Sequence, residues 1–142
     1  TLNPSRSTAN AANAATSLVR SILRGLNAAN PDICASAVMS SDGLVIASML
    51  QENTDPDRFG AMSASLLALA ERAAQEIDRG DLTQVLVGGT RGSVLLVQAG
   101  VDHVLAIGSS EEAQLGRILL EARRTAIRIE QCLNPRAAGE PR

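Results

Sequence analysis

A stretch of twelve residues without any charged side chain, Phe59 to Ala70, constrains the fold of this chain more than any other segment. It lies within a longer helical pattern that spans residues 57–79. Apolar side chains recur there at alternating spacings of three and four, which is typical of a helix with one face on a core. These positions are Phe59, Met62, Leu66, Leu69, Ala73 and Ile77. We expect this stripe to lie on the core of the domain.

The other side of the same helix is unusual in its first three turns, where it is also small or apolar. The residues concerned are Gly60, Ala61, Ala64, Leu67 and Ala68. Charged residues return at Glu71 and Arg72, so the uncharged segment is too short for a membrane span of about 20 residues. One sheet can cover only one side of such a helix, and the other side therefore needs a second surface.

We expect that second surface to be another copy of the chain. The residues predicted to form this dimer interface are Phe59, Gly60, Met62, Ser63, Ala64, Leu66, Leu67, Ala68 and Ala70. Two alternatives remain open at this point. The helix could be fully buried in an α/β core, or its alanine and glycine residues could simply face water.

Composition removes several classes of function. The chain has 142 residues, which predicts one domain, and a net charge of −2. Phe59 is the only aromatic residue, so base stacking cannot support nucleic-acid binding. The negative net charge also argues against the basic surface that such binding needs. All thirteen basic residues are arginines, which excludes a lysine Schiff base or a phosphate-loop lysine. We expect no nucleic-acid partner and no membrane insertion.

The two cysteines, Cys34 and Cys132, have neither metal-ligand spacing nor the density of a disulfide framework. Both lie in apolar patterns, so we interpret them as small core residues of a protein in a reducing compartment. Residues 1–15 are small and polar rather than basic and then apolar, which is not the pattern of a signal peptide. The sequence predicts a cytoplasmic protein.

Hydrophobic periodicity and turn residues predict an α+β domain at 16–133, with a flexible arm at 1–15 and a tail at 134–142. We expect a five-stranded antiparallel sheet with helices on both faces, in the order α-β-β-α-β-β-β-α. Thr54, Asp55 or Asp57 can cap the helix at 57–79. The remaining elements are a helix from Thr16 or Ser17 to Pro31, strands at 33–40, 44–49, 82–87, 93–99 and 103–108, and a helix starting at Ser109 or Ser110.

No group of residues carries a catalytic, cofactor or metal signature. The single histidine, His103, follows a turn and is interpreted as a polar residue at a strand end. The segment at 88–92 lacks the spacing of a phosphate-binding loop and predicts a hairpin. Arg91 within it could act as an arginine finger, but nothing in the sequence singles it out. We therefore expect a protein that is not an enzyme.

Four stretches give the chain a family resemblance. They are residues 33–48 with their Ser-Asp-Gly turn, Arg79-Gly80-Asp81, residues 92–100, and residues 115–124. In this order they resemble the roadblock/dynein light-chain family over about residues 16–133. The chain is most similar to prokaryotic members that regulate Ras-like small GTPases. The motifs are patterns of apolar residues and turns, not catalytic signatures.

The resemblance implies a homodimer in which the second helices pack together and the third strands join two sheets into one of ten strands. The edge strand would contain Leu82, Thr83, Gln84, Val85, Leu86 and Val87, which include no proline or charged residue that would block pairing. It also implies a non-enzymatic regulator or scaffold that binds a Ras-like small GTPase and modulates its GTP/GDP cycle, with or without activating hydrolysis. A small-molecule sensor domain and a purely structural adaptor remain alternatives.

Overall fold

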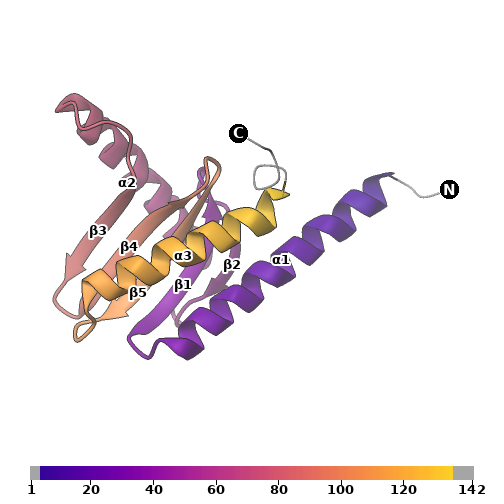
Figure 1. Ribbon diagram of the computed structural model, residues 1–142, viewed down its shortest axis with the longest axis horizontal. Coiled ribbons are helices and arrows are strands. Elements are labelled where there is room, and N and C mark those ends of the chain that lie inside the picture. The colour runs from indigo at the N-terminus through magenta and orange to yellow at the C-terminus, as the bar shows by residue number, and fades with distance from the viewer. Residues whose placement is uncertain (1–3, 136–142) are drawn as a thin grey trace.

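Three helices and five strands follow one another in the predicted order, α-β-β-α-β-β-β-α. The computed structural model describes residues 4–135 and confirms the α+β class (Figure 1). The bounds are α1 (Pro4–Ala29), β1 (Ile33–Ser40), β2 (Val45–Met49), α2 (Pro56–Glu76), β3 (Gln84–Gly89), β4 (Gly92–Ala99), β5 (His103–Ser110) and α3 (Leu115–Leu133).

The five strands form one antiparallel sheet in the order β2-β1-β5-β4-β3. Strand β5 lies at its centre, between β1 and β4. Strands β2 and β3 are its two edges, and the edge position of β3 agrees with the prediction. Residues 88–92 form the β3–β4 hairpin, with Gly89 opposite Gly92. His103 is the first residue of β5, again as predicted.

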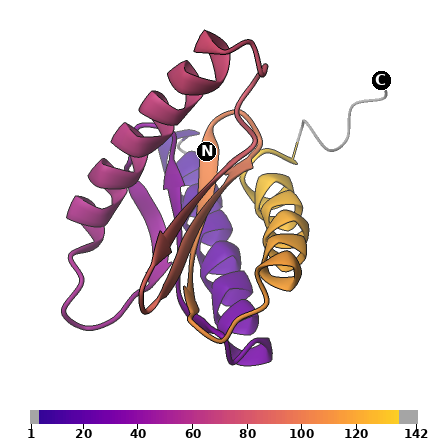
Figure 2. The same cartoon turned by 90° about the vertical axis from the view of Figure 1, so that its left-hand side faces the viewer.

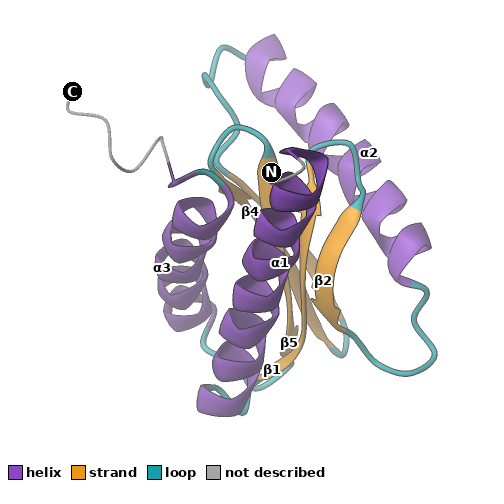
Figure 3. Ribbon diagram, turned by 90° about the vertical axis from the view of Figure 1, so that its right-hand side faces the viewer, coloured by secondary structure: helices purple, strands orange, loops and turns teal. Residues whose placement is uncertain are grey.

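The two faces of the sheet are covered unequally. Helices α1 and α3 lie side by side on one face, and α2 lies alone on the other (Figure 3). The core under α1 and α3 is the larger, and its central side chains are fully buried. Among them are Val19, Leu23, Leu105 and Ile129. The core under α2 is smaller, and Leu67 is the one large apolar side chain of that helix buried in it.

Two predicted helix starts were wrong. Helix α1 begins at Pro4 instead of at Thr16 or Ser17, because the segment before Thr16 is rich in alanine, the strongest helix former. Residues 4–15 are therefore helical where a flexible arm was expected. Helix α3 begins at Leu115, because Ser109 and Ser110 are paired within β5. Residues 1–3 of the predicted arm and 136–142 of the predicted tail lie outside the described residues.

The assignment of both cysteines to the core was also partly wrong. Cys34 is exposed and Cys132 is half-buried. Cys34 lies near the start of β1 and lines a hollow beside Phe59 at the start of α2. An apolar neighbourhood in the sequence does not ensure burial at the end of a strand.

Candidate functional site

Helix α2 is turned the opposite way from the prediction. The residues that it buries are Gly60, Ser63 and Leu67. Gly60 and Leu67 belong to the side that we described as small or apolar, and Ser63 lies between them on the same side. The stripe expected on the core faces outward: Met62 is 58% exposed, Leu69 is 63% exposed and Ile77 is 67% exposed. The prediction that this stripe lies on the core was therefore wrong, except at Phe59, which is half-buried and packs against the core under α2.

A contact between two glycines explains the reversal. Gly60 of α2 lies against Gly43, which has a φ of 92° in the β1–β2 turn. A Cβ atom on either glycine would collide with the backbone of the other, so only this side of the helix can approach the turn so closely. Asp55 accepts a hydrogen bond from the Asp57 backbone N–H at 3.0 Å and is the cap among the three predicted candidates.

The predicted interface residues of α2 thus fall into three groups. Gly60, Ser63 and Leu67 are buried within the chain itself; Phe59, Ala64 and Ala70 are half-buried; and Met62, Leu66 and Ala68 are exposed. Only the last group is fully available to another molecule. We call the exposed apolar face the outer stripe and define it as Met62, Leu66, Leu69, Ala73 and Ile77.

The distal half of α2 has almost no cover from its own domain. From Glu71 to Glu76 every residue is exposed except the half-buried Ala74. This end of the helix projects past the strands before the chain returns to β3 (Figure 2). A contiguous apolar stripe on such a helix is typical of a surface that another molecule covers.

Strand β3 presents unpaired backbone groups at a free edge of the sheet. The Gln98 backbone N–H donates to the Thr83 carbonyl at 3.4 Å, directly across from it. Because bonded and non-bonded positions alternate in an antiparallel pair, Val85 and Val87 also direct their backbone groups toward β4. The backbone N–H and C=O groups of Gln84, Leu86 and Gly88 therefore point away from the sheet, at its free edge.

The side chains of this edge are apolar and accessible. Leu86 is 49% exposed and Val87 is 41% exposed, while Val85 is half-buried. Leu82 and Thr83, which we predicted in the strand, precede it. An edge with free backbone groups and no charged or proline residue is ready to pair with another strand.

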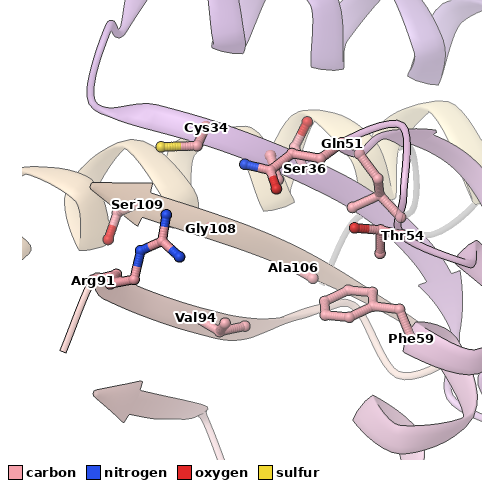
Figure 4. A pocket seen from close by; sticks show the side chains of 12 residues that line it. Cys34, Ser36, Gln51, Thr54, Phe59, Arg91, Val94, Ala106, Gly108 and Ser109 are labelled. Carbon is pink, nitrogen blue, oxygen red and sulfur yellow. The ribbon is translucent and has the colours of Figure 1, made fainter. Parts of the chain in front are cut away.

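A hollow that the sequence did not predict lies on the α2 face of the sheet (Figure 4). Its volume is about 420 Å³, and its apolar lining includes Ala35, Ala106, Gly108, Val94 and Phe59. Its polar lining residues include Cys34, Gln51, Thr54, Arg91 and Ser109. The hollow exists because small side chains occupy this end of the strands and α2 covers the other end. Predicting the hollow would have required the direction in which α2 crosses the sheet, and a sequence does not give that direction.

The charges near this surface are not paired within the described chain. Across residues 10–135, whose side chains the structure describes, there is one ion pair, between Glu121 and Arg124 at 3.7 Å. Arg91 and Asp81 are both exposed. In the same range no cluster of three or more His, Cys, Asp or Glu side chains could hold a metal ion. None of the helices there combines the length and apolarity needed to cross a bilayer.

Comparison with known proteins identifies the family. The model of the Roadblock/LC7 domain matches residues 20–109, which is more than half of the chain. The chain therefore belongs to the Roadblock/LC7 family, as its sequence motifs suggested.

Its relatives include proteins without an assigned function. An uncharacterized protein of Methanocaldococcus jannaschii is 38% identical over 98 residues, covering 69% of this chain and 85% of the relative. Another from the same organism is 34% identical over 114 residues, covering 80% of this chain and 95% of the relative.

Solved structures share the fold. MglB of Myxococcus xanthus has a TM-score of 0.76 at 16% identity, covering 82% of this chain and 95% of that chain. A Roadblock/LC7 domain from Streptomyces avermitilis has a TM-score of 0.74 at 23% identity, covering 80% of this chain and 96% of that chain. An MglB structure with a tetrameric arrangement has a TM-score of 0.75 at 18% identity, covering 84% and 90%.

Proposed function

We propose that this protein is a homodimeric, non-enzymatic regulator or scaffold that binds a Ras-like small GTPase and modulates its GTP/GDP cycle. The observation that carries the proposal is that one chain has both an uncovered outer stripe on α2 and an unpaired edge strand, β3. One chain alone leaves both surfaces open, and a second copy can cover both at once. The proposal places the protein in the cytoplasm, together with its GTPase partner.

The placement of α2 and β3 supports the proposed dimer. Antiparallel pairing of two β3 strands continues the sheet across the twofold axis, and strand pairing between copies satisfies the free backbone groups. The axis keeps both α2 helices on one face of the joined sheet, and the distal half of each, which lies where its own β3 begins, is directed toward the end of β3 of the partner subunit (Figure 1). Sedimentation of the wild-type chain should give twice the monomer mass.

The GTPase assignment draws on the family and on the sequence resemblance to prokaryotic GTPase regulators. Such a protein needs no catalytic group of its own. It can act by binding more tightly to the GTPase conformation in which that protein's own residues are placed for hydrolysis. The likeness to MglB supports the fold on which this function would rest.

The test uses the Ras-like GTPase of the same cell, loaded with GDP or with a GTP analogue. Binding to one nucleotide form in preference to the other, with altered phosphate release from GTP, is the expected result. Binding with unchanged hydrolysis would indicate the structural adaptor instead. If neither form binds, the regulatory function is wrong even where the dimer is present.

The hollow on the α2 face favours a second candidate, a small-molecule sensor. A cavity of about 420 Å³ with an apolar floor and a few polar groups on its rim has the usual character of a ligand site. A ligand should raise the melting temperature of the wild-type chain, and Gln51→Ala at the rim should reduce the shift. A screen of metabolites and nucleotides without any such shift would remove this candidate.

A further inference from the structure

We infer that the hollow on the α2 face binds a small carboxylate with an apolar body, and that Arg91 holds its carboxylate group. This ligand class rests on the second candidate function, the small-molecule sensor, and is independent of the GTPase partner. The lining of the hollow supplies three features for such a ligand: one positive charge, an apolar middle, and polar side chains on the far side from that charge.

Arg91 carries the only charge among the residues that line the hollow. The other lining residues are apolar or uncharged, so no carboxylate of the lining competes for the arginine. Within residues 10–135 Arg91 also takes no part in an ion pair. Arginine stays protonated at any physiological pH, so the hollow repels a cation and attracts an anion.

The position of Arg91 suits a carboxylate. Its side chain starts from the β3–β4 hairpin and lies over Gly108 and Ser109 of β5, at one end of the hollow (Figure 4). A guanidinium donates two parallel hydrogen bonds to the two oxygens of a carboxylate, so the two groups match in shape as well as in charge. An anion of the ligand is therefore fixed in orientation at this end.

The hollow offers little to a phosphate. No second basic residue lines it. Helix α2 begins beside the hollow, with Phe59 in its lining, and a helix N-terminus can attract a phosphate. Asp55 already occupies that N-terminus, because its carboxylate accepts a hydrogen bond from the Asp57 backbone N–H. One arginine beside a capped helix thus favours a single carboxylate.

The middle of the hollow is apolar. Its floor consists of short side chains, among them the half-buried Ala35 and the buried Ala106. Figure 4 shows Ala106 between Arg91 and the ring of Phe59, the only aromatic side chain of the protein. A volume of about 420 Å³ is in the range of small-molecule sites. The body of the ligand that follows its carboxylate is therefore expected to be apolar.

Two polar side chains are free on the far side of the hollow. The lining hydroxyls of Ser36 and Ser109 already donate to other groups of the chain. Within residues 10–135 the side chains of Gln51 and Thr54 form no hydrogen bond. Both lie across the hollow from Arg91 (Figure 4). They can bind a polar group at the other end of the ligand.

Three probes of the same chain length test the ligand class on the full chain, in the assembly that it forms in solution. Octanoate should bind saturably and raise the melting temperature. Neutral 1-octanol should bind about tenfold or more weakly, and cationic octylamine should not bind. Equal binding of all three, or no binding of octanoate and 3-phenylpropanoate, would overturn the ligand class. A melting-temperature shift with another metabolite would then still support the sensor.

Arg91→Gln tests the arginine. Arg91 is exposed, so the variant should fold as wild type does. The dissociation constant of octanoate should rise by about tenfold or more, whereas that of 1-octanol should not change, because only the first carries the charge. The matched control is Arg20→Gln on α1, which is exposed on the other face of the sheet. Unchanged octanoate binding by Arg91→Gln, or equal weakening by both variants, would overturn the role of Arg91.

Ala35→Leu tests the place of the ligand, because the larger side chain extends into the hollow. Binding of octanoate and of 1-octanol should both be lost, with a native circular dichroism spectrum. Ala28→Leu, at an exposed position of α1, is the control and should bind both as wild type does. A folded Ala35→Leu that still binds octanoate would place the ligand elsewhere. If Ala35→Leu does not fold, Arg91→Gln decides alone.

Discussion

The two faces of the sheet differ in what they leave exposed. On one face α1 and α3 bury large side chains such as Leu23 and Ile129 completely. On the other face α2 buries a glycine, a serine and one leucine, and turns its larger side chains outward. The first face has the composition of a domain core, and the second resembles an interface before assembly. The first set of residues holds the monomer together, and the second set includes those that we propose to form the dimer interface.

Leu23→Ala on the first face should have the largest effect on folding. Leu23 is fully buried, so the truncation removes apolar contacts and leaves a cavity. We expect a loss of about 2–5 kcal/mol in the free energy of unfolding, measured by urea denaturation. If this variant were as stable as wild type, the face under α1 and α3 would not be the part that holds the monomer together.

Leu69→Arg on the outer stripe should act on assembly instead. Leu69 is 63% exposed, so the monomer tolerates the arginine, whereas a dimer would have to bury its charge twice. We expect the dimer dissociation constant to rise by about 100-fold, measured by sedimentation, with a native circular dichroism spectrum. The matched control is Leu18→Arg on α1, where Leu18 is 55% exposed. Equal weakening by both variants would place the interface elsewhere.

Gly60→Ala tests whether the close contact with Gly43 fixes the position of α2 on its face of the sheet. The added methyl group would collide with the backbone of Gly43, so the helix would have to shift away from the turn. We expect a loss of about 1–3 kcal/mol in unfolding free energy. Gly116→Ala is the control, since a Cβ there meets nothing within 4 Å. Should the two substitutions have the same effect, the close contact between α2 and the turn would not be needed.

Asp55→Ala should have the smallest effect. The carboxylate of Asp55 caps α2 by accepting from the Asp57 backbone N–H. Its loss should lower the unfolding free energy by about 1 kcal/mol, seen as a small drop in melting temperature. Thr54→Ala, at the neighbouring position that does not cap the helix, is the control. A larger loss for Thr54→Ala would reverse the assignment of the cap.

Much of the fold could be predicted from the sequence because turns and strands are local signals. Strand β1 has the predicted bounds, and the Ser-Asp-Gly turn leads into β2. The orientation of α2 could not be predicted in this way. Both of its sides are apolar, so hydrophobicity alone does not decide which side faces the sheet. The Gly60–Gly43 contact decides it, and that contact joins residues whose proximity no periodicity reveals.

The candidate site was predicted only in part, because its residues depend on the orientation of α2. The edge position of β3 was implied by the family resemblance, and the involvement of α2 was predicted from the apolar character of its first three turns. The assignment of individual α2 residues depended on the orientation, and the buried Gly60, Ser63 and Leu67 therefore belong to the chain's own packing. The hollow depends on where a helix crosses a sheet, which is a three-dimensional property.

The glycine contact near the start of α2 also has a mechanical consequence. The helix is fastened to its domain near one end, while its other end extends beyond the sheet (Figure 2). A helix held in this way can pivot about its contact with the β1–β2 turn. Binding of a protein at the free end of α2 would therefore displace the β1–β2 turn, which lies at the β2 edge of the sheet, some distance from the binding site.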